Sequence, residues 1–249
     1  MTSLEYKELP SHGLEQKGEY YNPRAIEVYM VRHGKQNEYG DYHSALSPEG
    51  EQQAREFAHT LARNIANKSS VIKIKFSKEL RATETARLIK EEIDKLITDG
   101  LLPHSKLLAD HPTKQLKTTG ALIPIMDAGV PYEEAMEEWL NNTEKYPTAR
   151  TPEEIKREVD YLVHITSRTA ERVPAEGPGI IYVWVTHETA TWAVMQALAN
   201  KTPAEMGGSI GHLEPVKISF DKTNPYEPHV FFRGQELIYE HSKKETGKA

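Results

Sequence analysis

Residues 26–34, IEVYMVRHG, decide the fold class of this chain. The first six, Ile26–Val31, are nearly all apolar or aromatic, as expected for a strand covered on both faces of a sheet. Two further runs also read as strands: Val71–Phe76 (VIKIKF) and Ile180–Val185 (IIYVWV). Stretches with helical periodicity separate the three runs. This alternation predicts an α/β domain with a mostly parallel central sheet.

A recognisable helix N-terminus follows each of the first two strands. Ser47 and Pro48 supply an N-cap and a first helical residue, and apolar residues at helical spacing follow over 54–65. After the second strand, Ser77 is the expected cap of a helix whose apolar residues lie between 80 and 96. Both patterns predict helices that pack one face onto the sheet.

The second half of the chain contains further elements. A helix is expected after the third strand through about residue 199, and a capping box at 151–154 (TPEE) opens another. Residues 215–240 contain VKISF, HVFFR and ELIYE, which predict two or three shorter strands in an antiparallel edge or hairpin. The stretch 99–150 has five prolines and one modest helix around Tyr132–Leu140, and is interpreted as a cap insertion over one end of the sheet.

Length and composition predict one domain. The chain has 249 residues, enough for a large core, so we assign residues 1–24 to an arm, 25–240 to the domain and 241–249 to a polar tail. The first 25 residues are polar, and no apolar run approaches the ~20 residues of a membrane span. We therefore expect a cytoplasmic protein without a membrane segment.

Charge and cysteine content exclude several classes of function. Cysteine is absent, which rules out disulfide scaffolds, thiolate metal sites and cysteine nucleophiles. The net charge is −6 and the longest basic run is Lys243–Lys244, so the concentrated positive face of a nucleic-acid-binding protein is not expected. Binding of a small anionic substrate is not excluded, because it needs only a few basic residues close together.

Reactive side chains follow all three strands. Arg32, His33 and Gly34 come directly after the first strand, and His187 comes one residue after the third. Arg81 lies in the first turn of the helix after the second strand. Ligands of open parallel sheets bind beyond the carboxyl ends of the strands, so we expect these residues to meet at one edge.

The residue types in this cluster suit phosphoryl transfer. Guanidinium groups are permanent cations whose donors match phosphate oxygens. A neutral imidazole can attack phosphorus, while a second imidazole can donate a hydrogen bond beside it. Gly34 would let the backbone approach the bound group. The cluster therefore predicts phosphoryl transfer through a phosphohistidine.

Four ordered blocks resemble the histidine phosphatase superfamily, which includes the cofactor-dependent phosphoglycerate mutases. They are Val31–Gly34 (VRHG), Leu46–Ala54 (LSPEGEQQA), Ser77 with Arg81–Ala86 (RATETA), and Val185–His187 (VTH). The resemblance spans about residues 26–200, with the cap insertion between the third and fourth blocks. It implies a phosphoglycerate mutase-like, three-layer α/β/α fold.

The resemblance also implies a role for each matched position. His33 would be the nucleophile that becomes phosphorylated. The phosphoryl group would be bound by Arg32, Arg81, His187 and Gly34, with His187 also counted among the catalytic residues. Side chains supply the positive charge, so neither a metal nor another cofactor is implied, and the expected partner is a small phosphorylated substrate.

The general acid is a carboxylate in this family, often in the setting L-x-E after the second helix. Leu108-Ala109-Asp110 is the nearest match, which makes Asp110 the predicted acid. Three glutamates of the cap remain as alternatives: Glu133, Glu134 and Glu137.

The chain departs from the family pattern at several positions. Lys35-Gln36-Asn37 replaces the usual residues after Arg-His-Gly, and Glu188 stands where the family usually has glycine. A carboxylate beside a phosphate pocket is unfavourable unless it points away. The cap shows no mutase-like signature, so a phosphatase ranks above a phosphoglycerate mutase-type phosphotransferase. A catalytically inactive phosphate-binding relative is the third hypothesis.

Other hydrolase classes fit less well. Residues 187–191 (HETAT) begin like the zinc motif H-E-x-x-H but place threonine at the second ligand position. Residues 207–211 (GGSIG) match the G-x-S-x-G sequence of a serine hydrolase elbow, but no strand pattern precedes them, so they are interpreted as a flexible turn. These patterns favour neither a zinc enzyme nor a serine hydrolase, and they leave the substrate and the oligomeric state open.

Overall fold

The computed structural model describes residues 26–38, 43–116, 121–174, 178–199, 201, 204–221 and 224–237. The expected arm at 1–24 and tail at 241–249 lie outside these residues, as does most of the expected strand at 236–240. The side chains of 132–133 and 197–199 are also outside the description.

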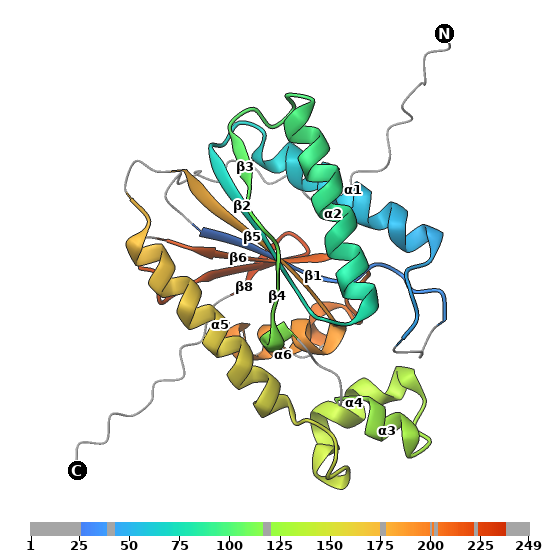
Figure 1. Cartoon of the computed structure of the whole chain (residues 1–249). Helices are drawn as coiled ribbons and strands as arrows, with labels where there is room; N and C mark the ends of the chain where they lie inside the picture. The colour runs from blue at the N-terminus through green and yellow to red at the C-terminus, as the bar shows by residue number, and fades with distance from the viewer. Residues whose placement is uncertain are drawn as a thin grey trace, which may run out of the picture.

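The sheet has the order β3-β2-β5-β1-β6-β7-β8 (Figure 1). Its centre consists of β1 (Ile26–Arg32), β5 (Gly179–Thr186) and β2 (Ser70–Phe76), which run parallel. The antiparallel edge predicted from the sequence consists of β6 (Pro215–Phe220), β7 (His229–Phe232) and β8 (Gln235–Leu237). All seven residues of β1 are buried, which explains why this strand carries the apolar run.

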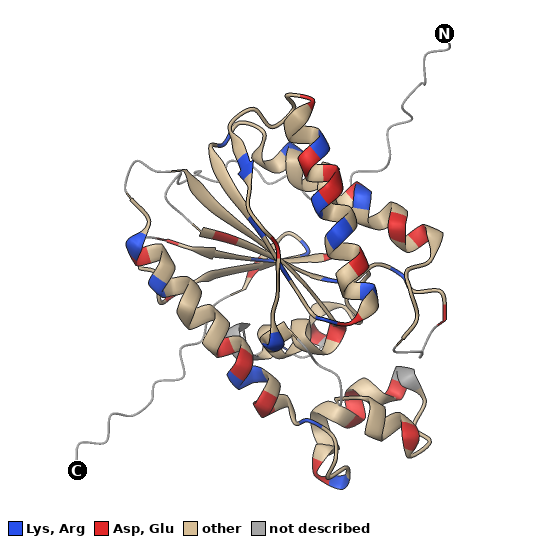
Figure 2. Ribbon diagram, viewed as in Figure 1, with Lys and Arg blue, Asp and Glu red and all other residues tan. Residues whose placement is uncertain are grey.

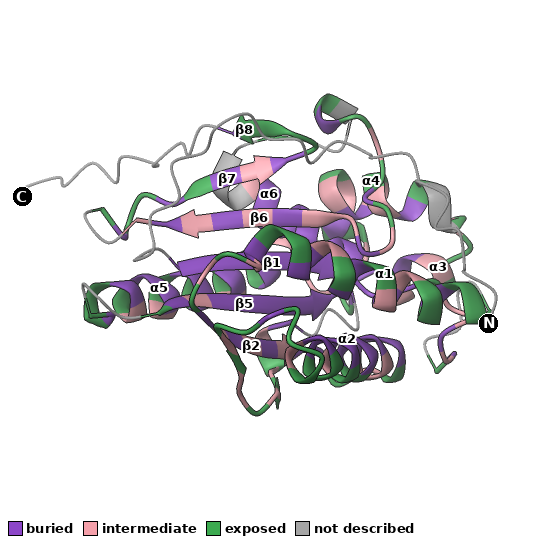
Figure 3. Ribbon diagram, turned by 90° about the horizontal axis from the view of Figure 1, so that it is seen from above, coloured by how far each residue is buried: buried purple, intermediate pink, exposed green. Residues whose placement is uncertain are grey.

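Helices cover both faces of the sheet, so the three-layer α/β/α fold is confirmed. On one face, α1 (Pro48–Ile65) and α2 (Leu80–Thr98) pack on a core that includes Val31 of β1. On the other face, α5 (Pro152–Arg172) and α6 (Glu188–Ala199) share a second core with Met30. Figure 3 shows β1 and β5 buried between the helices.

Two of the expected helix starts are present as predicted. Ser47 caps α1 through a hydrogen bond from the Gly50 backbone N–H to Ser47 Oγ at 3.1 Å. Thr151 and Glu154 form the reciprocal capping box of α5, with bonds of 3.2 and 2.9 Å. Each pair satisfies backbone N–H groups that the first helical turn leaves without partners.

The prediction for the start of α2 was wrong. The helix begins at Leu80 with Glu79 as its N-cap, and no side chain caps it. Ser77 lies two residues earlier, where its hydroxyl contacts His187 at 2.9 Å. Ser77 directly follows β2 and is still tied to β5, because its backbone N–H donates to Val185 O at 3.0 Å.

The stretch 99–150 contains more structure than expected. Its first part adds two short strands parallel to β2, β3 (Ser105–Leu107) and β4 (His111–Pro112), so it extends the sheet. These strands have two or three partly or fully exposed residues each, which leaves no apolar run to predict them. The remainder contains η1 (Lys114–Leu116), α3 (Ile123–Asp127), α4 (Tyr132–Asn142) and η2 (Thr143–Lys145).

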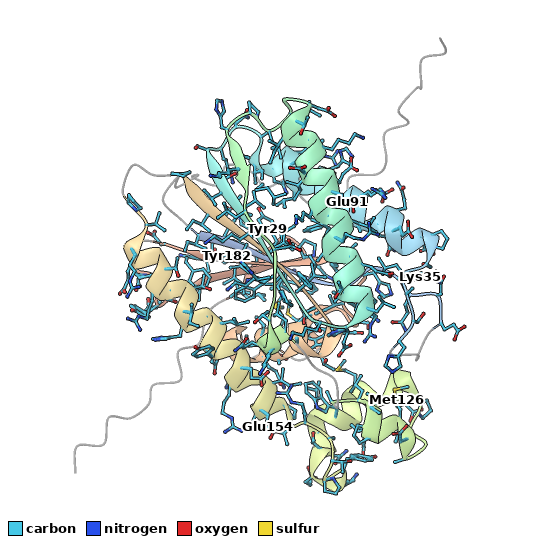
Figure 4. The ribbon with its side chains drawn as sticks, in the orientation of Figure 1. Tyr29, Lys35, Glu91, Met126, Glu154 and Tyr182 are labelled. Atoms are coloured by element: carbon cyan, nitrogen blue, oxygen red, sulfur yellow. The ribbon has the colours of Figure 1, made fainter. Side chains whose placement is uncertain are left out.

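The helices α3 and α4 form a small lobe beside the amino end of α5 (Figure 1). Trp139 of α4 is fully buried, and its indole N–H donates to Arg150 O at 2.7 Å. Met126, labelled in Figure 4, packs against the same core as Trp139. The lobe is therefore joined to the α5 and α6 side of the domain.

Basic and acidic residues are interspersed along α2 and α5 (Figure 2), in keeping with a sequence that contains 31 basic and 37 acidic residues. Within the part of the chain that the structure describes, no helix is long and apolar enough to cross a membrane.

Candidate active site

The candidate site lies at the carboxyl edge of the central strands. Arg32 is paired with Thr186 in the parallel register of β1 and β5, and the next backbone N–H, of His33, donates to Thr186 O at 2.9 Å. Thr186 in turn fixes η1, because its hydroxyl donates to Leu116 O at 2.8 Å. The strands therefore carry Arg32, His33 and His187 to one place, as the sequence predicted.

His33 is held as a neutral imidazole with one nitrogen directed into the pocket. Its Nδ1 lies 2.8 Å from Gly34 O, and its Nε2 accepts a hydrogen bond from Arg81 Nε at 2.8 Å. A carbonyl can only accept, so Nδ1 carries the proton and Nε2 keeps its lone pair. Burial, then His187 and Arg81, hold the pKa of His33 well below its usual value. His33 is therefore an uncharged imidazole, the form in which a histidine can act as a nucleophile.

Arg81 connects the two predicted catalytic histidines. Its Nη2 lies 3.3 Å from His187 Nδ1, and the rings of His33 and His187 are 5.2 Å apart in an edge-on arrangement. Because a guanidinium only donates, His187 Nδ1 accepts and its Nε2 carries the proton. Burial, followed by the charges of Arg81 and Arg32, keeps the pKa of His187 well below its usual value.

Glu79 is a carboxylate in the pocket that the sequence analysis did not identify. Its Oε2 lies 2.9 Å from Arg81 Nη2 and 3.2 Å from His187 Nε2. The side chain is 12% exposed. A single acid at a helix start is common because it interacts favourably with the helix dipole, so the sequence alone carried no signal for this placement.

Glu188 pairs with Arg32 on the other side of the pocket. Its Oε2 is 2.7 Å from Arg32 Nη1, while its Oε1 accepts from the Ser209 hydroxyl and, at 3.3 Å, from the Ile210 backbone N–H. Arg32 Nη1 also donates to Ile210 O at 3.1 Å. Glu188 is thus bound into the loop that precedes β6 and serves as a fixed counter-ion for Arg32.

His212 is a third histidine at the site and was also missed. Its Nδ1 lies 2.8 Å from His33 O, and the rings of the two residues are 5.6 Å apart. Burial, then the charge of Arg32, lowers the pKa of His212 to about 4. The sequence carried no signal for His212 itself, because its contact with His33 depends on how the loop folds back onto β1.

Gly34 has a packing role in the structure. A Cβ at this position would lie 2.6 Å from Gly50 O, so the turn into α1 leaves no room for a side chain. The Gly34 backbone N–H donates to Thr85 Oγ1 at 3.0 Å. Gly34 is therefore required by the close approach of another group, as expected, and in the structure this group is the backbone of α1 at Gly50.

The remaining candidates lie away from these contacts. Lys35 pairs with Glu49 at 2.5 Å on the exposed start of α1 (Figure 4). Asp110 pairs with Lys90 at 2.6 Å, and the hydrogen bond from Lys90 lowers the pKa of this carboxyl. Lys90 is nine residues beyond Arg81 on α2, or about 13 Å along the helix axis.

Of the three cap glutamates, Glu134 and Glu137 are exposed on α4, and the Glu133 side chain lies outside the description. Among the residues that the structure does describe, no group of three or more histidine and carboxylate side chains is arranged to hold a metal ion.

The architecture is a phosphoglycerate mutase-like α/β/α fold, and arginines and histidines meet at the carboxyl edge of its central strands. More particularly, residues 28–102 match the model of the histidine phosphatase superfamily (branch 1). This stretch includes Arg32, His33 and Arg81. The resemblance stated from the sequence is confirmed, whereas no curated protein matches the chain.

Solved structures with the same fold span most of this chain. A mycobacterial glucosyl-3-phosphoglycerate phosphatase aligns with a TM-score of 0.58 at 18% identity, covering 84% of this chain and 98% of that one. A phosphoglycerate mutase from Bacillus anthracis gives 0.56 at 16% identity, with coverages of 86% and 95%. A phosphoserine phosphatase from Entamoeba histolytica, solved with 3-phosphoglyceric acid, gives 0.53 at 15%, with coverages of 87% and 98%. At these identities the similarity defines the fold.

Proposed function

We propose that this protein is a phosphatase that hydrolyses a small phosphomonoester through a phosphohistidine intermediate on His33, without a metal. The observation that carries the proposal is the state of His33. Its Nδ1–H is fixed by Gly34 O, and its Nε2 lone pair accepts a hydrogen bond from Arg81 Nε, which Arg81 gives up as phosphorus approaches. The phosphatases and the mutase that share the fold support the same class of chemistry.

In the first step His33 Nε2 forms a bond to phosphorus while the bond from phosphorus to the ester oxygen breaks. The Arg32 and Arg81 guanidinium groups and the His187 Nε2–H bind the non-bridging oxygens, where charge is concentrated in the transition state. The leaving oxygen takes a proton from a general acid. Removing one of these electrostatic contacts typically costs on the order of 10²–10³ in rate.

In the second step a water oxygen bonds to phosphorus and the N–P bond breaks. The electron pair of that bond returns to Nε2 of His33, which restores the neutral imidazole. The proton lost by the water passes to the residue that acted as the acid. Inorganic phosphate and an alcohol are the products, and no other reactant is needed.

Asp110 is proposed as the general acid on its sequence position. Its pair with Lys90 favours the ionised carboxyl, so Asp110 has to leave Lys90 and gain a proton before it can act. Asp110→Asn should reduce turnover of alkyl phosphates more than turnover of p-nitrophenyl phosphate, whose leaving group needs little protonation. Equal losses on both substrates would place the acid on another residue.

The test of the proposal is turnover of p-nitrophenyl phosphate with a chelator present. Wild type is compared with His33→Ala and with His229→Ala, a matched change at an exposed position of β7. Wild type and His229→Ala should be active, whereas His33→Ala should be inactive with an unchanged circular dichroism spectrum. Mass spectrometry of the quenched wild type should find the phosphoryl group on the His33 peptide.

Other outcomes would favour the alternatives. Retained activity in His33→Ala would contradict the phosphohistidine mechanism. Inactivity of wild type towards the ester, combined with exchange of phosphate between phosphoglycerates, would identify a mutase. Inactivity in both assays, with phosphate binding retained, would identify a catalytically inactive phosphate-binding protein.

A further inference from the structure

Glu79 places one carboxylate oxygen between two groups of the phosphoryl pocket. Oε2 of Glu79 is 2.9 Å from Arg81 Nη2 and 3.2 Å from His187 Nε2. Both are donors that a phosphoryl oxygen would use. Both partners are buried, with side chains 7% and 6% exposed. Glu79 therefore has the position of an anionic ligand of Arg81 and His187, although Ser77 Oγ, at 2.9 Å, is the nearer partner of His187 Nε2.

The two carboxylates of the pocket differ in what else holds them. Glu188 is bonded through Oε1 to Ser209 and to the Ile210 backbone, so it can keep its place when a ligand arrives at Arg32. The contacts of Glu79 described above go to the pocket groups themselves. A phosphoryl group that binds Arg81 and His187 must therefore displace the Glu79 carboxylate or share its donors.

The charge balance of the site makes this competition strong. Arg32 and Arg81 contribute two positive charges, and Glu79 and Glu188 contribute two negative charges, so these four side chains sum to zero. Like charges placed together in a poorly hydrated site cost several kcal/mol. A dianionic phosphoryl group would add two further negative charges beside Glu79. A monoanionic group adds one, and its P–OH can donate a hydrogen bond to the carboxylate.

We propose that Glu79 is a specificity-determining residue of this pocket: an internal anionic competitor that makes the site prefer a singly protonated, monoanionic phosphoryl group to the dianion. This inference rests on the proposed phosphoryl-binding role of the pocket. Beyond that role, it proposes that the site distinguishes between the monoanionic and the dianionic form of the ligand. It also gives a route for release of inorganic phosphate, because Glu79 re-forms its bonds to Arg81 and His187 as the product leaves.

The groups that face Glu79 limit what can titrate with the ligand. They are Arg81 from α2 and His187 from the end of β5, with Arg32 and His33 behind them at the end of β1. Arginine stays charged in proteins. Burial holds the pKa values of His33 and His187 well below the usual value, so both rings stay neutral near neutral pH. A phosphomonoester loses its second proton near pH ~6. The ligand is therefore the group that changes charge in this range.

The test is calorimetric titration with inorganic phosphate at about pH 6 and about pH 8. Three proteins are compared: wild type, Glu79→Gln, and Glu91→Gln as a control. Glu91 lies on the same helix, outside the pocket and paired with Arg87 at 2.7 Å (Figure 4). Its substitution removes the same charge from α2 without touching the site.

Wild type and Glu91→Gln should lose affinity as the pH rises. Glu79→Gln should bind phosphate about tenfold or more tightly than wild type at the higher pH, with a weaker pH dependence. Glu79→Ser is a second variant that keeps the test valid if glutamine disturbs the site. Serine removes the charge and supplies a favourable N-cap for α2, which Glu79 does not provide through its side chain.

The outcomes separate this inference from the proposed function. Equal pH dependence in wild type and both Glu79 variants would overturn the role of Glu79, and would leave the phosphatase proposal intact. Absence of phosphate binding in every protein at both pH values would overturn both. Binding by the Glu79 variants alone would support the inference in its strongest form.

Discussion

The two arginines of the pocket have similar partners but different surroundings. Arg32 pairs with Glu188, which is fixed by a hydroxyl and a backbone N–H of the loop before β6. Arg81 pairs with Glu79, whose Oε2 also lies 3.2 Å from His187 Nε2. The site therefore has two halves. In the Arg32 half, the pair of Arg32 with Glu188 is fixed by the fold, whereas in the Arg81 half the pair of Arg81 with Glu79 lies among the groups of the proposed binding site.

This difference shows that an ion pair has a role set by its neighbours. A buried carboxylate that other protein groups also hydrogen-bond can orient its arginine without competing with a ligand for it. A carboxylate bonded to the ligand-binding groups competes with the ligand directly. The sequence alone does not distinguish Glu79 from Glu188, because each is an acidic residue near a predicted catalytic motif.

The largest expected effect is on stability when either arginine is removed. Arg32→Met leaves Glu188, 5% exposed, as an uncompensated buried charge, which should lower the free energy of unfolding by about 3–5 kcal/mol. Arg81→Met should cost about 1–3 kcal/mol, because Glu79 borders the pocket and can turn to water. Urea denaturation of both variants measures the difference. Equal losses would show that the two halves are built alike.

An intermediate effect is expected from pH. The pKa of His212 is lowered to about 4 in the folded protein, so between about pH 6.5 and 4 the unfolded chain binds a proton that the folded one does not. Stability is therefore complete above this window and falls as the pH falls through it, by up to about 1.4 kcal/mol per pH unit for each such histidine.

His212→Asn should reduce that slope, as measured by urea denaturation across the window. The same sign applies to His33 and His187, whose pKa values are also lowered, so the variant should keep part of the slope. An unchanged slope in His212→Asn would mean that His212 is accessible to protons in the folded protein.

The smallest expected effect comes from a residue that supports only the Arg32 half. Arg233 donates to Ser209 O at 2.8 Å and to Met206 O at 2.6 Å, which fixes the loop that holds Glu188. Arg233→Met should cost about 1 kcal/mol of stability, and should reduce kcat more than it raises the KM. A raised KM with kcat unchanged would contradict a role in orienting Arg32.

Much of the site could be predicted because its residues lie at strand ends. The apolar run of β1 located His33, and the rule that ligands bind beyond the carboxyl ends of strands brought Arg81 and His187 to it. The elements that escaped prediction lack such a signal. β3 and β4 are too short and too exposed to show a pattern, and both are defined by pairing with β2.

The missed site residues depend on tertiary contacts. Ser77 was predicted to be a helix cap because serine is common at the position before a helix. In the structure it directly follows β2, and its hydroxyl contacts His187. Glu79 resembled any acid of a first helical turn. His212 reaches His33 only because the loop folds back over β1. Local sequence records none of these contacts, which form when distant segments pack.

The contact between Gly34 and Gly50 has a consequence for motion. A Cβ on Gly50 would lie 2.0 Å from Lys35 O, so the peptide planes after β1 and at the start of α1 touch with no side chain between them. A side chain can rotate to absorb a displacement, whereas two backbones in contact cannot. We therefore expect the segment that carries His33 and the first turn of α1 to move together.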